Sequence, residues 1–564
     1  MPKSSRSNGP ELNRRDLLRL STAAGVGAVI APYGAFAKTR GGQVAVAAST
    51  CSTPRSAVAT TQYGKVRGYV EDGVLTFKGV PYGAPTGGEN RWLPAKPPTP
   101  WDGEYPALIY GANCPQRLHD WVSEQTFLFQ WTDGWQSEDM LKVNIWTSSL
   151  TARRPVMFYI HGGGYTFGSA YELASQDGAQ MARHHDVVSV TVNHRLNALG
   201  FLDMSELGGP AYAESANVGM TDLVAALRWV RDNIANFGGD PDRVMIYGQS
   251  GGGSKVTTLL GMPSAKGLIH TASAQSGGGG NPPSLEQSRD LARRITAELG
   301  VKDIAALQKV EWARLNEVGN AVVAKMNPPL SAGTGPIPDR GTAPRVGFGP
   351  TVDGRVVTMR AFFEGAPEIS KQVPMLIGSV SEEGNRMSSR PTESEWLATL
   401  NKSYGESKAA ALVAALKKAY PHKSIRTLSY MCSGAGLNGL GMRNNVTRMA
   451  TMKHEQQGAP VFTYYFTWQS PMLEDAGAWH TAELAFCFDN TARCAQGTGN
   501  GPEAQALATR VATAWANFAR TGNPSQPGLP WTPFTPDGCP TMVFDATCGT
   551  VNDPEGEARK ILLG

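Results

Sequence analysis

One serine of this chain stands where it could act as a nucleophile. Ser250 lies in the pentapeptide Gly248–Gly252, between the apolar run Arg243–Tyr247 and the apparent helix Ser254–Leu260. In a G-x-S-x-G arrangement, small neighbours let a strand turn sharply into a helix and expose the serine hydroxyl. A chain with 64 glycines can contain such a pentapeptide by chance. Its single occurrence, after a strand and before a helix, favours the nucleophile.

A serine hydroxyl needs partners before it can attack a carbonyl group. It needs a histidine base, an acid that orients the histidine, and N–H donors for the oxyanion. The strand-like run Pro155–Ile160 leads directly into His161–Tyr165, which contains three consecutive glycines. We expect the N–H groups of Gly163 and Gly164 to form the oxyanion hole together with that of Gly251. The alternative for these glycines is a flexible turn.

Two carboxylates compete for the role of the acid. The strand-like run Pro374–Ile377 is followed by a loop that contains Glu382 and Glu383 beside a glycine. In α/β-hydrolases the acid comes between the serine and the histidine in the sequence. Either glutamate fits that order, and the alternative for each is a solvated loop charge.

His480 is the best candidate for the base. Four of the nine histidines follow Ser250, and His480 lies in a loop beyond the strand-like run Val461–Phe466. His270 comes before the candidate acids, whereas His422 and His454 lie in polar surroundings typical of solvated side chains.

The elements around these residues alternate between strands and helices. The run Val187–Val192 is a further short strand, and apolar residues recur at helical spacing in Thr221–Phe237. This alternation predicts a large, mainly parallel central sheet with helices on both faces. We expect the helical stretches Ser284–Val323 and Glu393–Arg448 to be insertions that form a cap or gorge wall.

The chain resembles the type-B carboxylesterases, the family of bacterial para-nitrobenzyl esterases and animal cholinesterases. The similarity runs from about residue 60 to residue 550 and implies the α/β-hydrolase fold. It rests on the serine and glycine motifs and on five further segments, Phe77–Gly83, Ser137–Leu141, Asn193–Leu196, Asn236–Pro241 and Gln275–Gly277.

The resemblance also implies roles for individual residues. It selects Glu383 as the acid of the triad, His480 as its base and Ser276 as a supporting serine behind the triad. Two positions depart from the family pattern. Met140 replaces a cysteine, so Cys114 is expected to lack its usual disulfide, and Gly251 replaces an alanine while keeping the N–H donor.

We therefore expect a serine hydrolase that cleaves carboxylic esters through an acyl-enzyme and needs no metal or organic cofactor. The nearest alternative is hydrolysis of amides or carbamates by the same triad. A non-catalytic binding module of this family would have lost the serine or the histidine, and both are present. The expected substrate is a small ester with an apolar or aromatic moiety, and candidate pocket residues are Trp121, Phe127, Phe129, Trp131, Trp135 and Phe167.

The N-terminus resembles an export signal. Residues 1–37 contain the twin arginine Arg14-Arg15, a short apolar segment and the cleavage signature Ala35-Phe36-Ala37. The expected domains are a twin-arginine signal (1–37), a low-complexity linker (38–60) and a single hydrolase domain (61–564). We expect a bacterial protein exported to the periplasm or the medium, without a stable membrane anchor.

Charge and cysteine usage limit the possible partners. The formal net charge is +4, and residues 1–37, with five basic and two acidic side chains, carry +3 of it. The remaining +1 gives no reason to expect nucleic acid as a partner. The seven cysteines show no metal-ligand spacing. Short disulfides between Cys487 and Cys494 or between Cys539 and Cys548 remain open.

Overall fold

The structure is a computed structural model that describes residues 57–118, 127–128, 130–327, 346–384, 390–432 and 439–563. All of these belong to one compact unit, Cys51–Gly564. The predicted signal and all of the predicted linker before residue 57 lie outside the described residues. Within the described ranges, no helix is long and apolar enough to cross a membrane.

The main sheet has eleven strands in the order β14-β13-β12-β11-β10-β9-β7-β8-β6-β4-β3. The seven strands from β13 to β8 in this order run parallel to their neighbours, and the strands at both ends pair antiparallel. The parallel strands are β7 (Arg154–Ile160), β8 (Val188–Val192), β9 (Gly239–Gln249), β10 (Thr271–Gln275), β11 (Met375–Val380), β12 (Val461–Phe466) and β13 (Pro540–Phe544). The antiparallel end strands are β3 (Tyr69–Glu71), β4 (Val74–Pro81), β6 (Lys142–Thr147) and β14 (Gly549–Asn552). A separate small sheet contains β1 (Val58–Thr61), β2 (Gly64–Arg67) and β5 (Glu104–Pro106).

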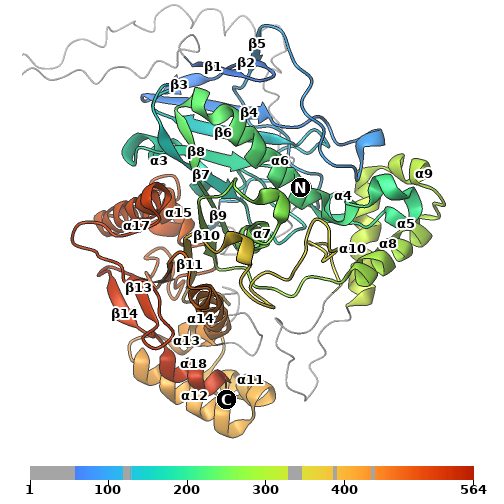
Figure 1. Ribbon diagram of the computed structural model, residues 1–564. Coiled ribbons are helices and arrows are strands. Elements are labelled where there is room, and N and C mark those ends of the chain that lie inside the picture. Colours follow the sequence, from blue (N-terminus) through green and yellow to red (C-terminus); the bar gives the residue numbers. More distant parts are fainter. Residues whose placement is uncertain are drawn as a thin grey trace, which may run out of the picture. The chain divides into compact units, whose positions relative to one another are not determined.

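Helices cover both faces of the main sheet, as the continuous apolar strands require. Successive side chains of β7 point to opposite faces. Phe158 belongs to the hydrophobic core that contains residues of α6 (Val218–Asn233), α7 (Gly251–Leu260) and α14 (Leu440–Glu455). Tyr159 belongs to a second core with α3 (Ala179–His184) and α17 (Pro502–Thr521). In Figure 1 the central strands lie between α17 on one side and α7 on the other.

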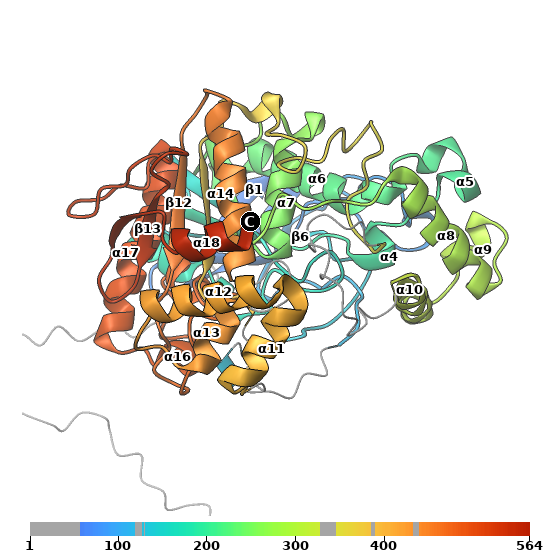
Figure 2. The same ribbon diagram turned by 90° about the horizontal axis from the view of Figure 1, so that it is seen from below.

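The two predicted insertions are helical, and they form two separate groups (Figures 1 and 2). The first contains α8 (Leu285–Leu299), α9 (Ile304–Gln308) and α10 (Trp312–Met326). The second contains α11 (Glu393–Tyr404), α12 (Glu406–Ala419) and α13 (Ile425–Met431). The C-terminal helix α18 (Gly556–Leu563) completes the second group, because its Ala558 shares a hydrophobic core with these helices. Lys418 at the end of α12 also pairs with Glu557 of α18 at 2.9 Å.

The predicted elements are present, with shifted ends. The strand before Ser250 begins at Gly239, and the helix after it begins at Gly251. The predicted helix Thr221–Phe237 is α6 followed by a 3-10 turn, Ile234–Phe237. The sheet is mainly parallel, but the sequence did not reveal its short antiparallel end strands. The remaining short helices are α4 (Asn197–Gly200), α5 (Ser205–Gly208), α15 (Leu484–Cys487) and α16 (Ala495–Thr498).

Candidate active site

Ser250 occupies the sharp turn between β9 and α7. Its backbone has φ +59° and ψ −121°, a conformation that residues other than glycine rarely adopt. The Ser250 N–H donates to the carbonyl of Gln275, at the end of the next strand, over 2.8 Å. A Cβ atom on Gly277 would lie 2.0 Å from the Ser250 carbonyl oxygen. Residues 275–277 of the same chain thus hold the strained turn in place. The strand, turn and helix follow each other as the sequence pattern predicted.

The glycine loop after β7 lies against this turn. Gly163 and Gly164 have φ values of +75° and +62°. A Cβ on Gly251 would lie 2.4 Å from the Gly164 nitrogen, so the two backbones are in direct contact. Among the hydrogen bonds of the described residues, none uses the N–H of Gly163, Gly164 or Gly251 as donor. Three free amides are therefore gathered beside Ser250, an arrangement suited to binding an oxyanion.

His480 is bound to Glu383. The imidazole Nδ1 donates to Glu383 Oε2, and Glu383 Oε1 accepts from the amide of Val380 at 3.2 Å. The Glu383 side chain is 2% exposed, against 31% for His480. Burial alone lowers the pKa of His480, but the charge and hydrogen bond of Glu383, with a contribution from Glu483, raise it above its ordinary value. The bond at Nδ1 leaves Nε2 as the nitrogen that can accept a proton.

Glu382 has a different environment from its neighbour. Its side chain is fully buried, and its Oε2 accepts from the amide of Ala478 at 2.7 Å and from the hydroxyl of Ser381. Lys423, between α12 and α13, donates to its Oε1 at 2.5 Å. The backbone of Glu382 also pairs with that of Trp479. Glu382 therefore fastens the loop that carries His480 to the end of β11.

Ser250 and His480 are not hydrogen-bonded to each other in the described structure. The side-chain amide of Gln249 lies beside the imidazole, with its Nε2 3.2 Å from Nε2 and 3.3 Å from Nδ1 of the ring. Catalytic hydrogen bonds are often long or misaligned in free enzymes and tighten when substrate binds. The structure thus brings His480 to the serine turn with Gln249 as its nearest polar neighbour from that turn.

The predicted supporting serine lies behind the turn. Ser276 is buried at φ +48°, and its N–H donates to the carbonyl of Gly378 at 2.8 Å. Its hydroxyl is buried without a partner in the described structure. The residue is thus placed between the ends of β10 and β11, close to Gly277 and the Ser250 backbone.

The other histidines lie elsewhere. His422 and His454 are exposed, as predicted. His161 and His194 are buried and stacked on each other, with ring centroids 5.0 Å apart. His185 is buried, and its Nε2 lies 3.1 Å from Asp489 Oδ2. Within the described ranges, no group of three or more His, Cys, Asp or Glu side chains could hold a metal ion.

Six of the seven cysteines lie in the described ranges, and all six are free. Neither short disulfide that the sequence left open is formed. Cys114 is buried, and its sulfur accepts from the amide of Leu196 at 3.2 Å. Met140, which stands where the family has a cysteine, is buried as well, and its sulfur accepts from the hydroxyl of Thr86 at 3.6 Å.

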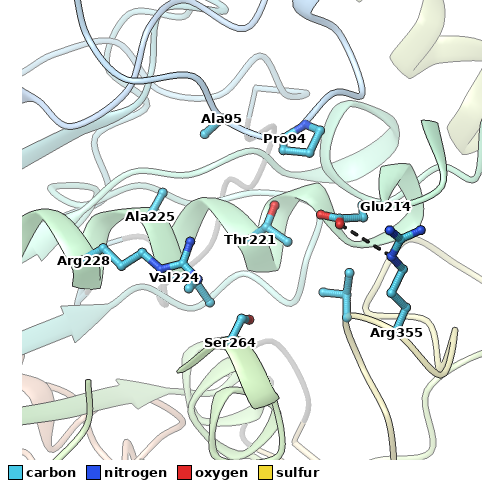
Figure 3. A pocket seen from close by; sticks show the side chains of 10 residues that line it. Pro94, Ala95, Glu214, Thr221, Val224, Ala225, Arg228, Ser264 and Arg355 are labelled. Atoms are coloured by element: carbon cyan, nitrogen blue, oxygen red, sulfur yellow. Dashed lines mark ion pairs between the residues drawn. The ribbon is translucent and has the colours of Figure 1, made fainter. Parts of the chain in front are cut away.

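Two cavities differ in their relation to the serine turn. One, of about 260 Å³, lies beside α6 and contains the Glu214–Arg355 ion pair, 3.8 Å long (Figure 3). It contains none of the candidate site residues. The other, of about 180 Å³, is lined by Tyr165, which follows the oxyanion glycines, and by Ser254 on α7. Further apolar lining comes from Phe348, Val357, Met359 and Ala361.

The predicted aromatic pocket is described only in part. Trp121 and Phe129 lie outside the described residues. Phe127 and Trp135 are exposed large side chains, at 49% and 54%. The rings of Trp131 and Phe167 pack edge to face, with centroids 6.1 Å apart. In the sequence, Phe167 is the residue of this set that lies closest to the glycine loop, three positions after Gly164.

Two residues near the site had no assigned role in the sequence analysis, and a third has a role that was not predicted. Gln249 contacts the imidazole, and Lys255 on α7 is fully buried beneath the glycine loop. Glu382, a candidate acid in the sequence, fastens the histidine loop instead. The sequence did contain a signal for Lys255. This lysine stands in a helix beside apolar residues such as Val256 and Leu259, and a lysine buried in such a place is rarely without a partner. Gln249 lies within the pentapeptide, at a position where the motif allows any residue, so the motif gave no signal for it.

Comparison with known proteins identifies the family of the chain. The sequence pattern of the Carboxylesterase family matches residues 55–555. The para-nitrobenzyl esterase of Bacillus subtilis is 32% identical over 513 residues, which cover 90% of this chain and 98% of that protein. Phenmedipham hydrolase of Pseudarthrobacter oxydans is also 32% identical, over 86% of this chain and 94% of the relative.

Solved structures show the same likeness. An esterase from Clostridium hathewayi, described as hydrolysing aliphatic aromatic polyesters, superposes with a TM-score of 0.76 at 33% identity, covering 91% of this chain and 99% of that one. A para-nitrobenzyl esterase structure gives a TM-score of 0.70 at 30% identity, over 90% of this chain and 99% of its own. The chain belongs to the carboxylesterase family, and with its α/β-hydrolase fold it is a carboxylic ester hydrolase.

Proposed function

We propose that Ser250, His480 and Glu383 form the catalytic triad of this esterase, with the N–H groups of Gly163, Gly164 and Gly251 as its oxyanion hole. The main support is that the strained Ser250 turn lies against the glycine loop, where the Gly251 and Gly164 backbones touch. The Glu383–His480 hydrogen bond supports the assignment of acid and base.

The chemistry follows from these positions. His480 Nε2 takes the proton of the Ser250 hydroxyl as its oxygen attacks the ester carbonyl, and the three amides stabilise the resulting oxyanion. The imidazolium then protonates the leaving alcohol, which leaves an acyl group on Ser250. Water then gives a proton to His480 as its oxygen attacks the acyl carbonyl, and the imidazolium returns that proton to the Ser250 oxygen as the carboxylic acid leaves. Glu383 holds the ring and stabilises its charged form throughout.

Gln249 must give way during the first step. Its amide lies 3.2 Å from the Nε2 that has to accept the serine proton. We propose that substrate binding moves this side chain or rotates the imidazole, so that Nε2 reaches Ser250.

The test uses chromogenic short-chain esters and an active-site label. Ser250→Ala and His480→Ala should each abolish turnover while the proteins keep the wild-type circular dichroism spectrum. A fluorophosphonate probe should label wild-type protein on Ser250 and leave Ser250→Ala unlabelled. Near-wild-type turnover in either variant, or labelling at another serine, would disprove the assignment. Matched ester and amide substrates compare the two hydrolytic activities that this triad can support.

We also propose that the preferred substrates carry an apolar or aromatic group. The 180 Å³ cavity supports this, because it begins at Ser254, whose hydroxyl lies 3.5 Å from the Ser250 carbonyl, and its other walls are mainly apolar. Each methylene in such a pocket adds only about 1–3 kcal/mol of discrimination, so several related esters should be accepted. A panel of acyl and alcohol groups measures the preference directly.

Finally, we propose that residues 1–37 are a twin-arginine export signal and that residues 61–564 are a single catalytic domain after a linker, residues 38–60. The twin arginine and the Ala-Phe-Ala signature support this. Expression in a bacterial host, followed by N-terminal sequencing of the exported protein, should give a start at Lys38. Retention of the protein in the cytoplasm with Met1 or Pro2 intact would contradict it.

A further inference from the structure

A lysine is fully buried beneath the oxyanion loop. Lys255 lies on α7, five residues after Ser250, and its side chain has no solvent exposure. Its ammonium group donates to the carbonyl oxygen of His161 at 3.0 Å and to that of Gly162 at 3.3 Å. Removing a lysine from water is expensive, so a fully buried one is rare and needs compensating partners.

The surroundings of Lys255 offset only part of the cost of burying it. Burial lowers the pKa of Lys255 to about 7, and the buried carboxylate of Glu172 acts in the opposite direction. The aromatic face of Tyr165 lies 5.7 Å from the lysine nitrogen. Burial lowers the pKa of both His161 and His194, so these rings are neutral. Both hydrogen-bonding partners of Lys255 are carbonyl oxygens, which its protonated form binds most strongly.

The two carbonyls that it binds belong to the loop that forms the oxyanion hole. The Gly162 carbonyl and the Gly163 N–H are the two ends of one peptide group. A cation bound to the oxygen draws electron density from the nitrogen, so the N–H becomes a stronger donor. It also fixes the plane of that peptide group, which decides where the N–H points.

The peptide groups of the other two donors have neutral partners. The Gly163 carbonyl, joined to the Gly164 N–H, accepts from the amides of Thr166 and Phe167, each at 3.2 Å. The Ser250 carbonyl, joined to the Gly251 N–H, accepts from the amide of Ser254 at 3.1 Å. Of the three, only the peptide group of Gly163 receives a hydrogen bond from a lysine, at a carbonyl oxygen that also lies 3.1 Å from Nδ1 of His161.

We propose that Lys255 is a positioning residue of the esterase: its buried ammonium orients and polarises the Gly162–Gly163 peptide group, which makes the Gly163 N–H a stronger donor to the oxyanion. The inference rests on the proposed function, because it takes Gly163 as an oxyanion donor to an ester attacked by Ser250. The oxyanion exists only in the transition state and the tetrahedral intermediate, so the effect of Lys255 belongs to kcat and not to substrate binding.

The experiment compares Lys255→Met, which removes charge and donor, with Lys255→Gln, which keeps a neutral donor. Lys453 on α14 offers a matched control, because it is 1% exposed and donates to the carbonyls of Ser370 and Lys371 at 3.1 and 2.8 Å, in a part of the chain without site residues. Lys453→Met thus reports what the loss of a buried, carbonyl-binding lysine does to the fold alone. Each full-length variant is measured by thermal unfolding, by kcat and KM on a chromogenic ester, and by inhibition with an aryl trifluoromethyl ketone, whose serine adduct carries an oxyanion.

Removing a direct oxyanion donor costs about 10²–10³ in kcat, so an indirect effect of about tenfold is expected in Lys255→Met, with a smaller loss in Lys255→Gln. KM should stay within about twofold, and affinity for the ketone should fall by the same factor as kcat. A kcat no lower than that of Lys453→Met at comparable stability would overturn the proposal. A fall in kcat with undiminished ketone affinity would overturn it too. Turnover by Ser250→Ala would instead defeat the proposed function itself, so the two failures are distinct.

Discussion

The buried carboxylate of Glu382 accepts a hydrogen bond from the amide of Ala478 over 2.7 Å, and Ala478 lies two residues before His480. Glu382 and Glu383 are adjacent in the chain, yet one binds the backbone of the histidine loop and the other binds the imidazole. The first interaction fixes where the loop begins, and the second fixes how the ring is turned. The pair therefore divides the placement of the base between two carboxylates.

Substitution of these glutamates should give different results. Glu383→Gln should lower kcat by about 10²–10⁴ with little change in stability, since it retains the shape but loses the charge that orients and stabilises the imidazolium. Glu382→Gln should mainly lower the thermal midpoint, because it leaves Lys423 without its charged partner. Steady-state kinetics and thermal unfolding of both variants measure the contrast. Equal kinetic losses in the two variants would contradict the division of roles.

Lys423 tests the same interaction from the other side. Its ammonium binds Glu382 at 2.5 Å, and Glu382 has no solvent exposure. Removing one partner of a buried ion pair typically costs about 3–5 kcal/mol, so Lys423→Met should lower the free energy of unfolding by about 3 kcal/mol, somewhat less than for a fully buried lysine. Lys417→Met serves as the control, because the Lys417–Glu393 pair is exposed and should contribute less than about 1 kcal/mol. Denaturant titration compares the two.

The activity should depend on pH through His480. The imidazole must be neutral to act as a base, and the pKa of His480 is raised above its ordinary value of 6.5. Activity should therefore be lost as the pH falls and rise through an inflection above pH 6.5. In Glu383→Gln the negative charge that raises the pKa of His480 is gone, so burial moves the inflection to lower pH. Profiles of kcat/KM for both proteins check the direction, and an unchanged inflection in Glu383→Gln would speak against the pairing.

Although the family carries an alanine at position 251, even that small side chain should be harmful in this chain. A Cβ there would lie 2.3–2.5 Å from backbone atoms of Gly164, so Gly251→Ala must push the glycine loop away from Ser250. The displacement moves oxyanion donors, and we expect a loss of kcat of about 10-fold or more. Gly549→Ala on β14 is the control, since a Cβ at Gly549 meets nothing within 4 Å. Wild-type kcat in Gly251→Ala would show that the loop can adjust without cost.

The cavity beside Ser254 should select among esters. Met359 lines it and is only partly buried, so Met359→Trp can fill part of the 180 Å³ without disturbing the main core. We expect kcat/KM to fall about tenfold or more for long-chain or aromatic esters and to change less than about twofold for an acetate ester. The acetate ester is thus an internal control. A uniform loss across the panel would indicate that the cavity does not receive the substrate.

The sequence was sufficient to predict the fold and to propose the triad. Apolar strands bounded by turn residues predicted β7, β9, β11 and β12, and the loops after them contain Gly163, Ser250, Glu383 and His480. Such residues are recognisable because one local pattern, a strand followed by a loop with a reactive side chain, is repeated in a fixed order. The short end strands such as β3 and β14 lacked that pattern, since they are partly exposed and only three or four residues long.

Other features depend on contacts between distant parts of the chain. Lys255 meets the His161 carbonyl across 94 positions, and Glu382 meets Ala478 across 96. No local periodicity encodes such pairings. His185 lies between the polar residues His184 and Asp186, which is typical of an exposed segment, yet Asp489, more than 300 positions away, provides a partner that permits its burial. The only local signal for these contacts was a charged residue among apolar ones, as at Lys255.

Helix α18 has a consequence for how the active site folds during synthesis of the chain. Ala558 of α18 completes the core of the group that includes α12 and α13, and the turn between those two helices carries Lys423, the partner of Glu382. A ribosome synthesises these eight residues of α18 after every residue of the triad has been made. The histidine loop thus acquires its full support only after α18 has been made, so a chain truncated before Gly556 should lack a correctly held base.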